Sequence, residues 1–100
     1  MARAVVWSRR ARADLNAIVD WISKDSPGNA ATVARRLVMR AATLADHPGQ
    51  GRRVPESGPR DETREVIVQR WRIIYRDSES EVLVLAIVHT SRLLRNVPPL

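Results

Sequence analysis

The sequence predicts an α+β fold in the order strand, helix, helix and then three strands, with a helix hairpin packed on one face of a small, mainly antiparallel sheet. Two observations lead to this prediction. Apolar residues recur at helical spacing through most of the first half, and short β-branched runs separated by turn residues fill the last third. The chain has 100 residues, the usual size of one domain, so we expect a single domain over residues 1–100.

The first strand and the first helix are expected to follow each other directly. Residues 4–7 are β-branched and aromatic, which favours a strand. Ser8 is expected to cap the helix, because a serine hydroxyl can accept a hydrogen bond from the first helical turn. The helix should run for about sixteen residues and end near Lys24-Asp25. Its apolar positions are Ala11, Leu15, Ile18 and Ile22.

The second helix is expected to begin at Ser26-Pro27, because serine is a good cap and proline is tolerated at the first helical position. Pro48-Gly49 is expected to end it. The connection between the two helices is short, so they should form an antiparallel hairpin. The apolar stripe of the second helix comprises Ala30, Val33, Ala34, Leu37, Val38, Ala41, Leu44 and Ala45.

Two features of the predicted hairpin are candidates for contact with a partner. Trp21 lies on the edge of the first apolar stripe, where it either packs at the rim or stays exposed as an anchor for another protein. Arg35, Arg36 and Arg40 lie on or beside the polar face of the second helix. We therefore keep both readings of Trp21 open.

Residues 48–61 show no periodicity and are rich in proline and glycine, which predicts a loop. Arg52, Arg53 and Arg60 make this loop basic. A loop of such length in a small domain commonly has a function. It contains no G-x-G-x-x-G or Walker pattern, so we do not expect a phosphate-binding loop there.

The last third is expected to form three consecutive strands. Residues 63–68 and 71–76 flank Gln69-Arg70, which suggests a tight hairpin, and residues 77–80 make a second turn. Residues 82–88 are apolar at nearly every position and therefore predict a central strand covered on both faces. The face of the sheet away from the helices is only half apolar, so its arginines are expected to stay hydrated.

Composition excludes several classes of site. The chain has no cysteine, which excludes a disulfide framework and a thiol nucleophile and suits the reducing cytoplasm. No apolar run approaches the ~20 residues of a membrane span. His47 and His89 are far apart and outside any metal-binding spacing, so we expect neither a metal nor another cofactor.

The charge points to an anionic partner. There are 17 basic and 11 acidic residues, net +6, and every base except Lys24 is arginine. Arginine makes forked contacts to phosphate and carboxylate. A nucleic acid or an acidic protein would fit such a chain, although a GC-rich genome also favours arginine over lysine.

The remaining catalytic possibility is RNA cleavage, which needs an acid, a base and cations around the phosphate. His89 would be the acid or base, unless it is a strand-end histidine bonded to the backbone. Glu65 would be a second proton carrier. The candidate cations are Arg64, Arg72, Arg76 and Arg92, and Arg64 and Arg72 are expected to share one face of the sheet.

The order of elements and the local motifs resemble the RelE/ParE superfamily of bacterial toxins from type II toxin–antitoxin systems. The resemblance covers nearly the whole chain. In the helices it lies in Trp7-Ser8, Ala11, Asp14-Leu15, Ile18, Trp21 and Ser26-Pro27. In the loop and strands it lies in Pro48, Gly51-Arg52, Pro55-Glu56, Arg64-Glu65, residues 71–76, Val88-His89 and Arg92.

The motifs resemble the ParE branch most closely. That resemblance implies a toxin that poisons DNA gyrase by binding rather than by catalysis, and a ParD-like antitoxin that forms a hetero-oligomer with it. Direct contact with nucleic acid is compatible with this reading but not required by it. The candidate gyrase contacts are Arg52, Arg53, Arg92 and Arg95. The candidate antitoxin contacts are Trp21, Arg36, Arg40, Arg72 and Arg76.

The alternative is the RelE branch, which implies a ribosome-dependent mRNA endoribonuclease. That branch usually has clustered lysines and arginines, with a tyrosine or histidine near the C-terminus. Here the only tyrosine is Tyr75 and the only lysine is Lys24, so the resemblance to a catalytic set is incomplete.

Overall fold

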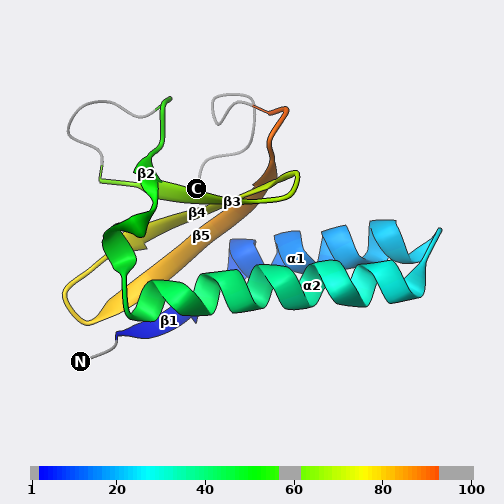
Figure 1. The fold of residues 1–100 in the computed structure, drawn as a ribbon, viewed down its shortest axis with the longest axis horizontal. Coiled ribbons are helices and arrows are strands. Elements are labelled where there is room, and N and C mark those ends of the chain that lie inside the picture. The colour runs from blue at the N-terminus through cyan, green and yellow to red at the C-terminus, as the bar shows by residue number, and fades with distance from the viewer. Residues whose placement is uncertain (1–2, 57–61, 93–100) are drawn as a thin grey trace.

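The computed structural model describes residues 3–56 and 62–92 and has two layers. A five-stranded sheet forms one layer, and helices α1 (Arg9–Ser23) and α2 (Pro27–Ala42) lie side by side in the other (Figure 1). This arrangement confirms the predicted α+β fold. None of the helices in the described part of the chain combines the length and apolarity needed to cross a membrane.

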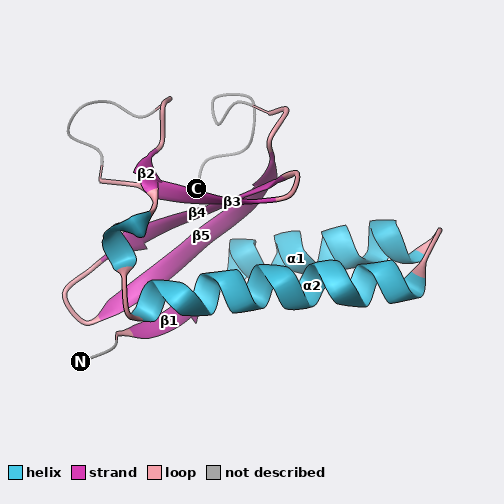
Figure 2. Ribbon diagram, in the orientation of Figure 1, coloured by secondary structure: helices cyan, strands magenta, loops and turns pink. Residues whose placement is uncertain are grey.

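Both helices begin at the predicted serine caps. Ser8 Oγ accepts a hydrogen bond from the Ala11 N–H at 3.0 Å, and Ser26 Oγ accepts one from Asn29 N–H at 3.2 Å. Pro27 occupies the start of α2, where the missing N–H has no cost. The two helices form the expected antiparallel hairpin (Figure 2).

The strands follow the order β1-β5-β4-β3-β2 across the sheet. They are β1 (Ala4–Trp7), β2 (Arg52–Arg53), β3 (Arg64–Val68), β4 (Trp71–Asp77) and β5 (Glu81–His89). β1 runs parallel to β5 and the other pairs are antiparallel. The tight turn between β3 and β4 places Gln69 at a φ of 55°. In this strand order β5 lies between β1 and β4, as its apolar sequence predicts.

The core has a part on each face of the sheet. Between the sheet and the helices, buried side chains include Ile18, Leu37, Ile73 and Val84. On the outer face, which is the face away from the helices, a smaller cluster comprises Val54, Ile74, Ala86 and Val88. Val54 belongs to the segment that follows β2, so this segment covers part of the outer face.

Three details differ from the sequence-based expectations. α2 ends at Ala42, and two short 3₁₀ helices, Thr43–Ala45 and Pro48–Gln50, follow it. The predicted loop contains β2, because Arg52 and Arg53 pair with Glu65 and Arg64 of β3. Val38 is 45% exposed rather than buried: Leu37 and Ala41 of the same turn are fully buried, so Val38 lies at the margin of the packed face.

Candidate functional site

The register of the sheet separates the arginines that were expected to share a face. Arg64 pairs with Tyr75, whereas Arg72 pairs with Ile67. Directly paired residues lie on the same face and neighbours along a strand alternate. Arg64 is therefore on the helix side and Arg72 is on the outer face, and the expectation that the two share a face was wrong. Arg76 lies on the outer face with Arg72 and is exposed.

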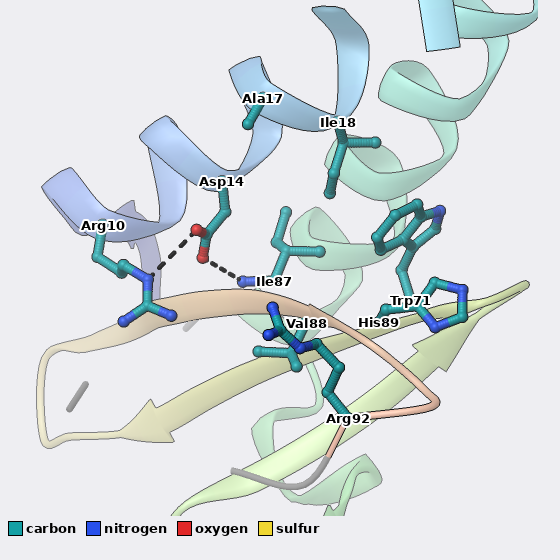
Figure 3. Close-up of a pocket in the computed structure, with 9 residues that line it drawn as sticks. All are labelled: Arg10, Asp14, Ala17, Ile18, Trp71, Ile87, Val88, His89 and Arg92. Atoms are coloured by element: carbon teal, nitrogen blue, oxygen red, sulfur yellow. Dashed lines mark hydrogen bonds and ion pairs between the residues drawn. The ribbon is translucent and has the colours of Figure 1, made fainter. Parts of the chain in front are cut away.

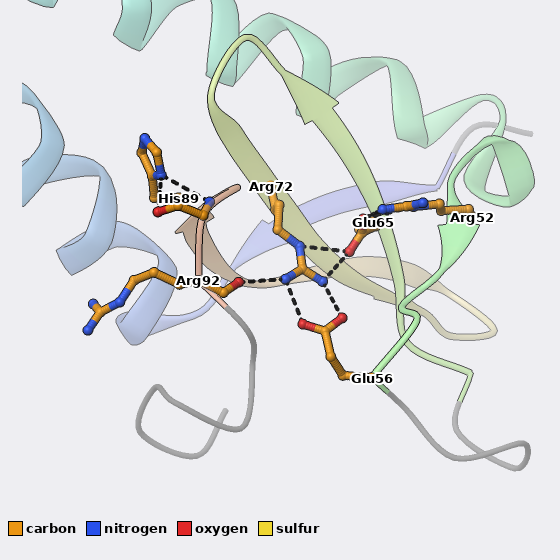
Figure 4. Close-up of polar contacts among 7 residues, drawn as sticks. Arg52, Glu56, Glu65, Arg72, His89 and Arg92 are labelled. Atoms are coloured by element: carbon orange, nitrogen blue, oxygen red, sulfur yellow. Dashed lines mark hydrogen bonds and ion pairs between the residues drawn. The ribbon is translucent and has the colours of Figure 1, made fainter.

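Arg72 is the centre of a buried cluster of charged groups on the outer face (Figure 4). Arg72 is 5% exposed, which corrects the expectation of a hydrated arginine. Both Nη atoms bind the Glu56 carboxylate at 2.8 Å, and Nε binds Glu65 at 2.9 Å. Arg72 Nη1 also donates to the carbonyl of Arg92, and Arg52 binds the second oxygen of Glu65 at 2.9 Å. The two carboxylates raise the pKa of Arg72, and Glu56 contributes most.

The sequence did not predict that Glu56 belongs to this cluster. It was noted only as part of the Pro55-Glu56 motif. Its partner Arg72 is 16 positions away and belongs to another element. Periodicity relates only residues of one element, so a pairing over this separation leaves no periodic signal.

Arg64 holds the segment before β2 against the sheet. Its Nη1 donates to the Gly51 carbonyl at 2.7 Å. The buried hydroxyl of Tyr75 accepts a hydrogen bond from Gly51 N–H at 2.9 Å and donates one to the Pro48 carbonyl at 2.6 Å. Arg64 and Tyr75 therefore position residues 48–51, and the Arg64 guanidinium is engaged by backbone.

The burial of Tyr75 predicts a loss of stability at alkaline pH. Burial raises the pKa of Tyr75 above its ordinary value of about 10. The unfolded chain therefore releases this proton at a lower pH than the folded protein. The contribution of Tyr75 to stability should be complete below about pH 10 and should decline as the pH rises further. Urea unfolding at pH 8 to 11 measures this decline. The Tyr75→Phe variant should lack the part of the decline that is due to ionisation of Tyr75.

Phenolate absorbance gives an independent check, because Tyr75 is the only tyrosine in the chain. In the folded protein the absorbance change should occur above pH 10. A change centred near pH 10 while the protein remains folded would contradict the effect of burial.

His89 lies at the end of β5 on the helix side, paired with Trp71 of β4. The two rings meet edge to face with centroids 5.1 Å apart. His89 Nδ1 accepts a hydrogen bond from the Ser91 N–H at 3.1 Å, so the neutral ring carries its proton on Nε2. His89 and the Arg72 cluster are thus on opposite faces of the sheet, and Glu65 is bound to two arginines. In the described part of the chain, no three His, Asp or Glu side chains are grouped to hold a metal ion.

The other candidate residues are spread over the surface. Arg53 and Arg92 are exposed, and Arg52 is exposed while it binds Glu65. Arg36 is exposed on α2, and Arg40 binds Thr43 Oγ1 at 2.8 Å. Arg95 lies outside the described residues.

An exposed apolar surface runs along the helix hairpin and β3. Trp21 is 68% exposed, which favours its reading as a partner anchor over rim packing. Met39 of α2 is 62% exposed and Ile67 of β3 is 49% exposed. Met39 and Ile67 line a groove of about 430 Å³ together with Arg36, Arg40, Thr43 and Val68. A second groove, of about 620 Å³, is lined by Trp21, Ile22, Asn29, Val33, Gln69, Arg70 and Trp71.

These two grooves, which we call the hairpin grooves, combine apolar side chains with arginines. Large exposed apolar patches are uncommon on monomeric proteins and mark interaction sites. The hairpin grooves are therefore the part of the described surface best suited to bind another protein.

Comparison with known proteins agrees with this architecture. Residues 5–94 match the family described as ParE toxin of type II toxin-antitoxin system, parDE. The chain is 39% identical over 90 residues to Toxin RelE2 of Caulobacter vibrioides, covering 89% of this chain and 97% of that protein.

Two solved structures share the fold. The chromosomal ParDE toxin–antitoxin system from P. aeruginosa matches with a TM-score of 0.73 and 24% identity, over 88% of this chain and 96% of that one. The toxin–antitoxin complex RelBE2 from Mycobacterium tuberculosis matches with a TM-score of 0.62 and 22% identity, over 89% and 99% of the two chains. From the family match and the identity to a curated toxin, it follows that this chain belongs to the ParE toxin family of type II toxin–antitoxin systems, within the RelE/ParE superfamily.

Proposed function

We propose that this toxin acts by binding DNA gyrase and holding the enzyme with its DNA cut, and that it is not a catalyst. The observation that carries the proposal is the neutralisation of Arg72 by Glu56 and Glu65. Ribonuclease chemistry needs cations free to stabilise the charge on the phosphate. The most buried arginine of the sheet is instead bound to two carboxylates, and His89 lies on the other face.

A gyrase cleavage assay tests the proposal. The purified chain is added to gyrase, ATP and negatively supercoiled plasmid, and the products are treated with detergent and protease. Linear DNA should accumulate with toxin concentration and should be absent when gyrase is omitted. Arg53→Ala is expected to weaken the effect, whereas Arg35→Ala, which removes the same charge from the exposed face of α2, should not. Folded toxin that neither inhibits gyrase nor yields cut DNA would reject the proposal.

The second candidate is a ribosome-dependent endoribonuclease. It is favoured by the Nε2–H donor of His89 and the exposed Arg92 three residues later, and by the identity to a protein named Toxin RelE2. Primer extension on translated messages after induction would reveal cuts within codons, and His89→Ala should abolish them. Intact messages together with an SOS response would favour gyrase as the target.

We also propose a cognate ParD-like antitoxin that binds in the hairpin grooves and inhibits the toxin. The exposed side chains of Trp21, Met39 and Ile67 can receive apolar residues, and Arg36 lies beside Met39 and Ile67. A net charge of +6 suits an acidic segment that folds as it binds. The edges of the sheet at β1 and β2 are further places where a strand can add.

The Met39→Asp substitution is expected to weaken antitoxin binding at least tenfold. It places a charge among apolar contacts and loses about 1–3 kcal/mol of burial. Surface plasmon resonance against the product of the neighbouring gene measures the dissociation constant. Asn16→Asp, on the exposed face of α1, adds the same charge outside the grooves and should change affinity by less than about threefold. Equal losses in both variants would indicate general charge repulsion instead of groove binding.

A further inference from the structure

The edge of β5 continues beyond the end of its neighbour β1. β1 pairs with β5 only as far as Trp7 opposite Val84, whereas β5 continues to His89. Beyond Val84, the side chains of Ser8 and of α1 bind backbone groups of β5 that β1 does not reach. Ser8 Oγ donates to the Leu85 carbonyl at 3.0 Å, and Asp14 Oδ2 accepts from the Ile87 N–H at 3.0 Å.

A pocket of about 200 Å³ opens where these side-chain contacts end (Figure 3). Residues of α1, β4 and β5 form its walls, and Arg92 reaches from the chain after β5 back toward Asp14 and Ile87. The single carboxylate is occupied, because Asp14 also accepts a hydrogen bond from Arg10 Nε at 3.2 Å. Arg10 therefore compensates the charge of Asp14. Arg92 and His89 line the pocket in addition to this pair.

The register adds backbone and ring donors at the same place. The Ile87 N–H points away from β4 toward Asp14, and Thr90 N–H donates back to Arg70 of the β3–β4 turn. Backbone directions alternate along a strand, so the His89 N–H points to the same side as that of Ile87. His89 also keeps a proton on Nε2, because Nδ1 is bound to Ser91. Because the Ile87 N–H is bound to Asp14 and the Thr90 N–H to Arg70, the donors that the pocket offers are those of His89 and the guanidinium of Arg92.

We propose that this pocket binds a phosphate group of a nucleic acid strand, with Arg92 as the principal cation and Trp71 as the aromatic wall for the adjoining nucleotide. Its volume suits one phosphate group. Aromatic side chains beside cations are typical of sites for single-stranded nucleic acid. The pocket lies on the helix side of the sheet, separate from the Arg72 cluster on the outer face. The proposal rests on the proposed function in one respect: the strand would be the DNA that gyrase holds cut.

Binding of short oligonucleotides to the purified chain tests this directly, without gyrase. The probes are a 5′-phosphorylated single-stranded deoxyoligonucleotide, the same oligonucleotide without its terminal phosphate, and inorganic phosphate. Amide and indole NMR resonances report the site, and shifts are expected at His89 and Trp71. Preference for the phosphorylated probe would identify a terminal phosphate as the ligand, and equal binding of both oligonucleotides would identify an internal phosphodiester.

Arg92→Ala is the decisive variant, because it removes the guanidinium but keeps the carbonyl that accepts from Arg72. It should weaken oligonucleotide binding about tenfold and reduce the slope of log affinity against log salt by about 0.7. Arg35→Ala removes an equal charge from α2 and should leave the shifts at His89 and Trp71 unchanged. Equal losses in both variants, or shifts absent from the pocket, would overturn the proposal. The oligonucleotide assay contains no gyrase. A failure to bind oligonucleotides would therefore leave a positive gyrase cleavage result valid, and a negative gyrase result would leave oligonucleotide binding valid.

Discussion

Replacing Arg72 with methionine is expected to lower the free energy of unfolding by about 3 kcal/mol or more. Arg72 binds Glu65, whose side chain has no exposed surface, and Glu56, which is also largely buried. Removing the cation affects two carboxylates: Glu65 keeps its contact with Arg52, and Glu56 loses the guanidinium that binds both of its oxygens. Methionine keeps the apolar stem of the side chain and lacks the guanidinium, so the loss reports the removed charge together with the hydrogen bonds of that group. Urea unfolding followed by tryptophan fluorescence measures it.

Two matched variants separate the buried charges from simple loss of packing. Arg72→Met with Glu65→Met removes the most buried ion pair and leaves Glu56, whose side chain is 16% exposed. It is expected to recover more than half of the loss, because a buried ion pair can be replaced by apolar residues at little cost. Arg52→Ala removes the exposed partner of Glu65 and should cost no more than about 1 kcal/mol. A loss below about 1 kcal/mol for Arg72→Met would mean that water reaches the cluster.

The double variant also bears on function. If the cluster serves only to hold residues 54–56 and the chain at Arg92 against the sheet, a folded double variant should still inhibit growth. A folded but inactive double variant would instead assign the Arg72 cluster a direct part in toxicity and would favour the ribonuclease reading.

Gly51→Ala is expected to destabilise the protein by roughly 3 kcal/mol. A Cβ at this position would meet the Glu65 carbonyl at 2.6 Å and would also collide with the Tyr75 hydroxyl. Neither neighbour can withdraw easily. The carbonyl belongs to β3, and the hydroxyl binds Gly51 N–H and the Pro48 carbonyl. Thermal or urea unfolding measures the effect.

Gly49→Ala is the matched control, since a Cβ there meets nothing within 4 Å. It should change the free energy of unfolding by less than about 0.5 kcal/mol. A comparable loss in both variants would mean that the close contact at Gly51 is not the cause, because the effect of Gly→Ala on chain entropy alone would be stabilising.

The local structure follows from the sequence because its signals are local. Ser8 and Ser26 cap the helices as expected, since a cap depends on groups only three residues away. The turn at Gln69-Arg70 and the burial of β5 follow from short-range patterns as well. The motifs that these elements carry also identified the superfamily, which the comparisons confirm.

The site depended on long-range pairing that no local pattern encodes. A shift of one residue in register moves a side chain to the other face of a sheet, so the sequence could not decide whether Arg64 and Arg72 lie together. The expectation that Arg72 stays hydrated failed for a related reason. Glu56, which binds the guanidinium of Arg72, comes from a segment without periodicity.

The sequence by itself therefore determined the elements, their order and the toxin family, because caps, turns and apolar periods act over a few residues. Only the tertiary structure decided which arginines are neutralised and which are available. It pairs Arg72 with two carboxylates, attaches Arg64 to the Gly51 carbonyl and leaves Arg92 beside a pocket with His89. The physical reason is that the charge a side chain presents depends on partners brought to it by strand register and chain packing, however distant they are in sequence.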